Sequence, residues 1–99
     1  MAQFDVHELK SGGLVLDCQS EAVSDIVSTR FVVPLFEPET VPRAIKSLHP
    51  LLRFQDREVA MATQLATAVP SKELSRPLGS LAHERYTILN AIDFLITGV

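Results

Sequence analysis

The chain of 99 residues has no tryptophan, one cysteine and no long uninterrupted apolar run. A lone cysteine cannot form an internal disulfide, and no group of cysteines and histidines offers four zinc ligands, so we expect no metal and no cofactor. The most apolar stretch near the end, residues 92–99, contains Asp93 and is much shorter than the ~20 residues that span a bilayer. We also find no signal-peptide pattern after Met1, and we expect a cytoplasmic protein without membrane attachment.

Basic residues are also scarce. The chain contains nine Lys and Arg and twelve Asp and Glu residues, which gives a net charge of -3. A protein that binds phosphates directly usually has a basic patch, so the composition argues against direct contact with nucleic acid. The chain is 46% hydrophobic, an apolar surplus for so small a domain, and we expect a homodimer to cover part of it.

No catalytic motif is present, since the sequence lacks a glycine-rich phosphate loop, HExxH and GxSxG. The three histidines are far apart, and we interpret them as surface or capping residues. We interpret three aspartates as solvated carboxylates at turns and strand edges. Cys18 lies on the apolar face of its predicted strand and should behave as a small buried hydrophobe. These histidines and aspartates are His7, His49, His83, Asp17, Asp25 and Asp56.

The first two-thirds of the chain reads as short strands separated by turns, and the last part changes to a helical period. The pattern predicts strands near residues 3–7, 14–19, 31–36, 52–55, 59–63 and 67–70. Residues 31–36 are apolar on both faces, which places them deep in the sheet, and Pro34 requires a bulge or an exposed edge there. We therefore predict a mostly β, α+β fold: an antiparallel sheet with one C-terminal α-helix packed on it.

The predicted helix has Ser80 as its N-cap and ends at Gly98, since glycine adopts the left-handed conformation easily. Near its end the apolar residues surround the helix almost completely, although a helix packed on one sheet needs only one apolar stripe. Two interpretations stay open: extra core or dimer contact, or an exposed apolar patch that binds another protein. The stripe consists of Leu81, Ile88, Leu89, Ile92, Leu95, Ile96 and Val99, with Phe94 beside it.

Several short stretches follow one another in a characteristic order. They are Leu16-Asp17-Cys18-Gln19-Ser20, Arg30-Phe31-Val32-Val33-Pro34-Leu35, Met61-Ala62-Thr63, Ala68-Val69-Pro70, Leu81-Ala82-His83 and the ending from Ala91 to Val99. In this order they resemble the VDVQS, RxVIPL, MxT, SVP, LSH and AINxxxxGI patterns of CcdB-type toxins. The likeness runs in register over nearly the whole chain, so we expect residues 1–99 to form a single CcdB-like domain.

The resemblance implies a homodimer with an SH3-like barrel. It implies a type II toxin–antitoxin toxin, associated with plasmid maintenance, that binds the A subunit of DNA gyrase and traps the covalent gyrase–DNA cleavage complex without catalysis of its own. The implied second partner is a CcdA-like antitoxin, which wraps a disordered segment around the toxin dimer. Toxin and antitoxin together would repress their operon, with operator DNA contacted only through the antitoxin.

The resemblance also implies where gyrase binds: the end of the last helix and the residues after the Gln-Ser pair. Gly98 and Val99 match the family's terminal Gly-Ile, and Thr97 stands where some members have a tryptophan. The gyrase-binding residues implied in this chain are Ala22, Val23, Asp93, Ile96, Thr97, Gly98 and Val99.

Two alternatives remain open. One is a MazF-like endoribonuclease, which shares the broad fold and could use Arg30, Thr63 and His83. The other is a degenerate relative that binds only the antitoxin and co-regulates the operon. The absence of an aromatic residue at Thr97 keeps this second alternative open.

Overall fold

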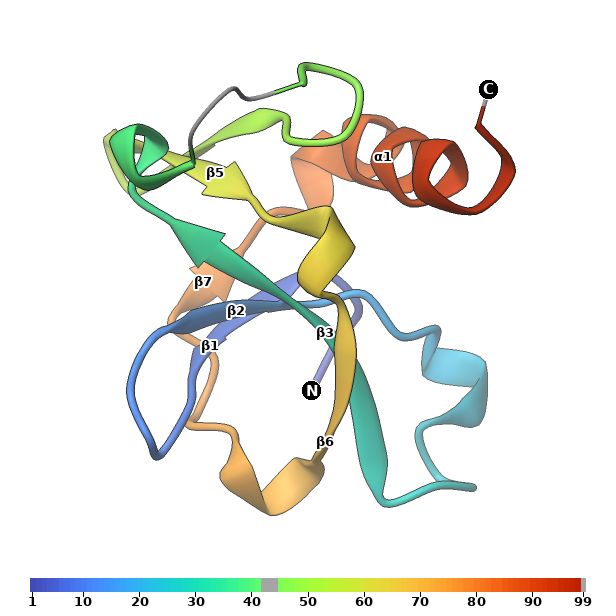
Figure 1. The fold of residues 1–99 in the computed structure, drawn as a ribbon. Helices are drawn as coiled ribbons and strands as arrows, with labels where there is room; N and C mark the ends of the chain where they lie inside the picture. The colour runs from blue at the N-terminus through green and yellow to red at the C-terminus, as the bar shows by residue number, and fades with distance from the viewer. Residues whose placement is uncertain (42–44, 99) are drawn as a thin grey trace.

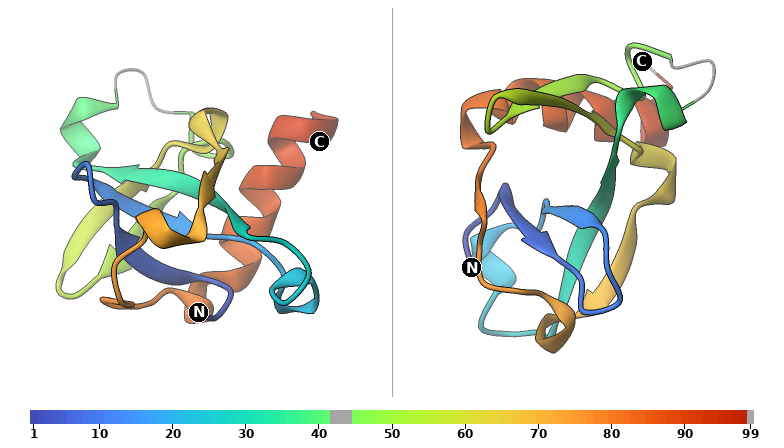
Figure 2. Two further views of the ribbon diagram at one scale, coloured as in Figure 1. Left: turned by 90° about the horizontal axis from the view of Figure 1, so that it is seen from below. Right: turned by 90° about the vertical axis from the view of Figure 1, so that its left-hand side faces the viewer.

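Figure 1 shows a computed structural model of the chain, in which residues 1–41 and 45–98 are described. The sheet contains β1 (Asp5–Glu8), β2 (Leu14–Asp17), β3 (Thr29–Phe36), β4 (Leu51–Phe54), β5 (Arg57–Met61), β6 (Thr67–Pro70) and β7 (Gly79–Ser80). Short 3-10 turns lie between the strands: η1 (Glu21–Val23), η2 (Pro38–Thr40), η3 (Thr63–Leu65), η4 (Ser71–Glu73) and η5 (Ala82–Glu84). The helix α1 (Arg85–Thr97) follows them and lies along one side of the sheet (Figures 1 and 2).

All strand pairs are antiparallel, in the order β4-β5-β3-β2-β1-β7, with β6 beside β3. The two end strands approach each other. The Gln55 side-chain amide donates to the Leu78 carbonyl at 2.8 Å, and a Cβ at Gly79 would lie 2.8 Å from the Phe54 ring. Glycine is required at this close approach. The sheet therefore forms a nearly closed, SH3-like barrel with a single helix, which confirms the predicted fold class.

β3 is the central strand, as its apolar faces predict. Val33 and Leu35 belong to the main core beneath α1, whereas Val32 belongs to a smaller core on the other side of the strand, with Val15 and Leu74. Pro34 requires neither a bulge nor an outer edge. Pro34 lies where the partner of β3 changes from β6 to β5. Its carbonyl accepts from the Ala62 amide, and the N and C=O of one strand residue face the same side. The position of the missing N–H therefore faces the gap between β6 and β5, where no ladder hydrogen bond is needed.

The helix begins later than the sequence indicates. Ser80 lies in β7, and its hydroxyl accepts from the Ala82 amide at the start of η5. α1 itself begins at Arg85, after a Glu84 that makes no side-chain cap hydrogen bond. The predicted N-cap was therefore wrong because a short strand and a 3-10 turn occupy the segment assigned to the first helical turn.

Candidate functional site

The last turn of α1 projects beyond the part of the helix that the barrel covers (Figure 1). Ile88 and Ala91 are fully buried against the main core, and Leu89 and Ile92 are partly buried against it. One turn later, Leu95 is 42% exposed and Ile96 is 73% exposed. Within one chain, the apolar helix end is thus an exposed surface and not part of the core.

The helix end has a defined shape. The Thr97 hydroxyl donates to the Asp93 carbonyl at 2.8 Å, and the Gly98 amide donates to the Phe94 carbonyl at 2.9 Å. Gly98 has a φ of 78°, the left-handed cap that the sequence predicts. Asp93, Ile96, Thr97 and Gly98 therefore form one exposed group, which we call the helix tip. The predicted contact residue Val99 lies outside the described residues.

The second predicted contact segment, Ala22 and Val23, lies in η1. Both residues are exposed, and the Ser20 hydroxyl accepts from the Ala22 amide at 3.1 Å to begin the turn. η1 and the helix tip lie apart in all three views (Figures 1 and 2). One chain therefore brings four of the predicted residues together at the tip and leaves Ala22 and Val23 at a separate place.

Sequence reasoning missed further exposed apolar side chains. Ile26, three residues after Val23, is 75% exposed, and Leu65 in η3 is about half exposed. η3, which carries Leu65, contacts α1, and it also contacts β3, which carries the exposed Phe31. Each of the two turn segments contains a large aliphatic residue, Ile26 or Leu65, that could have indicated this surface. A search for the periods of strands and helices does not detect such residues.

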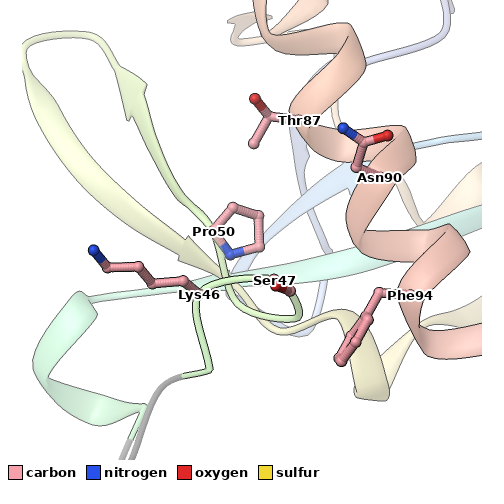
Figure 3. A pocket seen from close by; sticks show the side chains of 6 residues that line it. All are labelled: Lys46, Ser47, Pro50, Thr87, Asn90 and Phe94. Atoms are coloured by element: carbon pink, nitrogen blue, oxygen red, sulfur yellow. The ribbon is translucent and has the colours of Figure 1, made fainter. Parts of the chain in front are cut away.

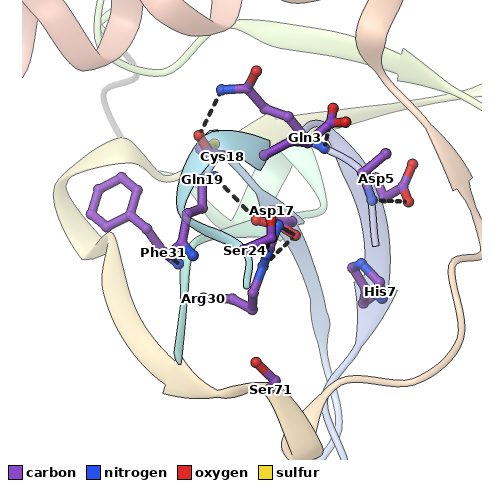
Figure 4. Close-up of polar contacts among 12 residues, drawn as sticks. Gln3, Asp5, His7, Asp17, Cys18, Gln19, Ser24, Arg30, Phe31 and Ser71 are labelled. Atoms are coloured by element: carbon purple, nitrogen blue, oxygen red, sulfur yellow. Dashed lines mark hydrogen bonds and ion pairs between the residues drawn. The ribbon is translucent and has the colours of Figure 1, made fainter. Parts of the chain in front are cut away.

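Asp17 is not the solvated carboxylate that the sequence suggested. It is fully buried, and its Oδ2 lies 2.9 Å from Arg30 Nε and 2.6 Å from Arg30 Nη2 (Figure 4). Arg30 itself is 3% exposed, and its Nη1 donates to the Ser24 hydroxyl at 2.8 Å. The register of β2 and β3 explains the pair, because Asp17 faces Val32, two residues from Arg30 and on the same face of β3.

Two of the three histidines also differ from their surface interpretation. His7 is fully buried, and its Nδ1 lies 2.8 Å from the Ser75 carbonyl. His49 is 8% exposed and bonds to the Ile45 amide and the Gln64 side chain, whereas His83 is exposed in η5. Each buried ring is held by hydrogen bonds within the fold. Among residues 1–41 and 45–98, no group of three His, Cys, Asp or Glu side chains could hold a metal ion.

Cys18 is buried on the core side of the sheet, as predicted. Burial raises the pKa of its thiol from 9.0 to about 12, and the neighbouring Asp17 carboxylate adds to the effect. Because the thiolate is the reactive form, the Cys18 thiol is unreactive in the folded protein.

A hollow of about 390 Å³ lies between loop 45–50 and the outer face of α1 (Figure 3). Phe94 lies across the hollow from Ser47 and Pro50 of the loop, while Thr87 and Asn90 lie further along the same helix face. Among the described residues that line the hollow, Lys46 is the charged one. Phe94 is therefore half-buried beside this loop and is less available than Ile96 to a partner at the tip.

Comparison with protein families matches residues 3–98 to the CcdB family, described as CcdB protein. No curated protein matches the chain. In the part of the chain that the structure describes, we find no helix with the length and hydropathy needed to cross a membrane.

Proposed function

The chain belongs to the CcdB family, the toxins of toxin–antitoxin systems, and from this premise we propose that it binds the A subunit of DNA gyrase. In this proposal the toxin traps gyrase while the enzyme is covalently joined to cleaved DNA. The toxin performs no catalysis of its own, and its contribution is binding energy at a protein surface.

The exposed helix tip is the observation that best supports this function. Ile96 presents nearly three-quarters of its surface on a small domain in which an earlier aliphatic residue of the same helix, Ile88, is fully buried in the core. Apolar groups of this kind on a folded surface are typical of protein-binding sites. We propose Asp93, Ile96, Thr97, Gly98 and Val99 as the main gyrase contact, with Ala22 and Val23 as the second.

We further propose that the protein acts as a cytoplasmic homodimer. Phe31, Leu65 and Leu95 leave an apolar surface across β3, η3 and α1, which favours self-association. Two-fold symmetry would present two copies of each contact segment, so the second contact on a dimeric target becomes effectively intramolecular. A CcdA-like antitoxin would neutralise this dimer, and operator DNA would be contacted only through the antitoxin.

A cleavage assay tests the proposal directly. Purified protein is incubated with gyrase, supercoiled plasmid and ATP, and the reaction is stopped with detergent and protease. We expect linear plasmid to accumulate with the wild-type protein and to disappear when a CcdA-like antitoxin is added first. Absence of linear plasmid at a toxin concentration that saturates gyrase would contradict gyrase poisoning.

The degenerate relative is the second candidate, and Thr97 is the observation that favours it, because the tip has no aromatic side chain there. This candidate predicts that the protein binds antitoxin but neither traps gyrase nor harms a gyrase-sensitive strain. The endoribonuclease alternative finds less support: Arg30 and Thr63 are buried, and only His83 is exposed. Incubation with RNA in the same buffer separates this alternative, because a MazF-like enzyme would cut the RNA without gyrase.

A further inference from the structure

The segment between β2 and β3, residues 18–28, has little apolar anchoring. None of the three residues of η1 is buried, and the following Ile26 and Val27 are both exposed. The hydrogen bonds within the segment are local: the Ser24 amide donates to Glu21, and the Ile26 amide donates to Val23. Such a segment is a candidate for local opening unless contacts to the barrel hold it.

Apart from the buried Cys18 side chain at its start, the contacts that hold its two ends are polar. The Gln19 side chain donates to the Thr29 carbonyl and accepts from the Phe31 amide, both at 3.0 Å. At the other end, the Ser28 carbonyl accepts from the amide and the hydroxyl of Ser71, both at 2.9 Å. These bonds fix where the segment leaves and rejoins the barrel, and they leave the orientation of its middle to other contacts.

Arg30 supplies the buried contact to the middle of the segment. Its Nε and Nη2 bind the buried Asp17 carboxylate, and its Nη1 donates to the Ser24 hydroxyl (Figure 4). A second contact to the middle, from the Gln3 amide to the Glu21 carboxylate, is longer at 3.3 Å and exposed. A hydrogen bond to a buried cation is stronger than an exposed one, and its loss leaves a buried donor unpaired.

We propose that Arg30 is a positioning residue for partner binding, acting through Ser24. The rigid guanidinium fork, fixed on Asp17, holds Ser24 and with it the neighbouring turn that presents Ala22 and Val23. The inference rests on the proposed function, because it takes Ala22 and Val23 as contacts to the gyrase A protein. It adds that this contact depends on a buried charge pair on the smaller-core side of β2 and β3.

The test removes the contact at Ser24 and leaves the buried pair intact, because substitution of Arg30 or Asp17 endangers the fold. Ser24→Ala deletes the accepting hydroxyl, Ser24→Thr keeps one, and Ser47→Ala is the control at an exposed serine in another loop. Amide hydrogen exchange is measured at Ile26 and Val27 in the segment, with the paired core residues Leu16 and Val33 as reference. Affinity for a purified gyrase A fragment is measured in parallel.

We expect Ser24→Ala to accelerate exchange at Ile26 and Val27 about tenfold and to weaken gyrase binding by about three- to tenfold, with core exchange unchanged. Ser24→Thr should restore both quantities, and Ser47→Ala should change neither. Unchanged exchange at Ile26 and Val27 in Ser24→Ala overturns the proposal, and so does faster exchange with full affinity.

Failure of the proposed function gives a different result. If the wild-type protein does not bind the gyrase A fragment, the assignment of the partner is wrong. The proposed role of Arg30 in binding that partner is then wrong as well. The exchange measurement still decides whether Arg30 orders the segment. If the wild type binds but Val23→Ala binds equally well, η1 is not a contact, and the positioning role is refuted on that ground.

Discussion

Truncation of Ile96 to alanine should weaken partner binding without destabilising the fold. Full burial of an isoleucine side chain contributes about 1.5–3 kcal/mol. Because Ile96 is 73% exposed, most of this free energy is still available to a partner, which gives about 1–2 kcal/mol, or about 5- to 30-fold in the dissociation constant. The loss of folding stability should stay within about 0.5 kcal/mol, as for most surface substitutions.

Two variants of the same helix serve as controls. Tyr86→Ala removes a side chain that is 76% exposed in the first turn of α1, far along the helix from the tip. It should leave both affinity and stability unchanged. Ile88→Ala removes a fully buried side chain and should cost about 2–5 kcal/mol of stability in urea unfolding, because it leaves a cavity in the core.

Isothermal titration against a gyrase A fragment, together with urea unfolding of each variant, provides the two measurements. If Ile96→Ala destabilises the protein as much as Ile88→Ala, the tip is packed against something in solution and is not a free surface. If Ile96→Ala binds as tightly as the wild type, the tip is not the contact. Either result would refute the reasoning from exposure to partner binding.

Further outcomes follow from three residues, Asp17, Thr97 and Cys18. Asp17→Asn leaves the buried Arg30 charge unpaired and should cost about 3–5 kcal/mol in urea unfolding, and a loss below about 1 kcal/mol would contradict the buried pair. Thr97→Trp adds an aromatic side chain at the exposed tip and should tighten gyrase binding about tenfold or more without a change in melting temperature, so unchanged affinity would exclude Thr97 from the contact. The Cys18 thiol, with its pKa raised to about 12, should resist iodoacetamide at pH 8 until the protein unfolds. Since the unfolded thiol loses its proton near pH 9.0, the stability attributable to Cys18 should fall as the pH rises from 9 toward 12, and Cys18→Ala should reduce this slope.

The strand pattern and the helix were predictable because their signals are local. Apolar residues on both faces of residues 31–36 identify β3 as central, and the change to a three- and four-residue period identifies α1. The start of the helix was not predictable in the same way. Ser80 satisfies the rule for an N-cap, but its backbone pairs with Asp5 at the other end of the chain, and this tertiary pairing outweighs the local preference.

The buried polar groups were the main failure of sequence reasoning. An aspartate between Leu16 and Cys18 reads as the solvent side of a half-buried strand, yet both faces of β2 are covered. Arg30, on the next strand, pairs with Asp17 and so compensates for the burial of its charge. Only the register of β2 and β3 shows that these two side chains lie on the same face. The helix tip is exposed within one chain, which excludes the interpretation of its apolar residues as core of that chain, and its role as a contact to a partner stays a prediction.

In the proposed function, folding and partner binding use different turns of the same helix. Ile88 and Ala91 contribute to stability because the barrel covers them, whereas Ile96 contributes almost nothing to stability in a single chain because the barrel does not reach it. An exposed isoleucine has a cost for a lone domain, since it favours nonspecific association. Its presence next to a glycine cap that fixes the end of the helix is therefore better explained by a partner that covers it than by the needs of folding.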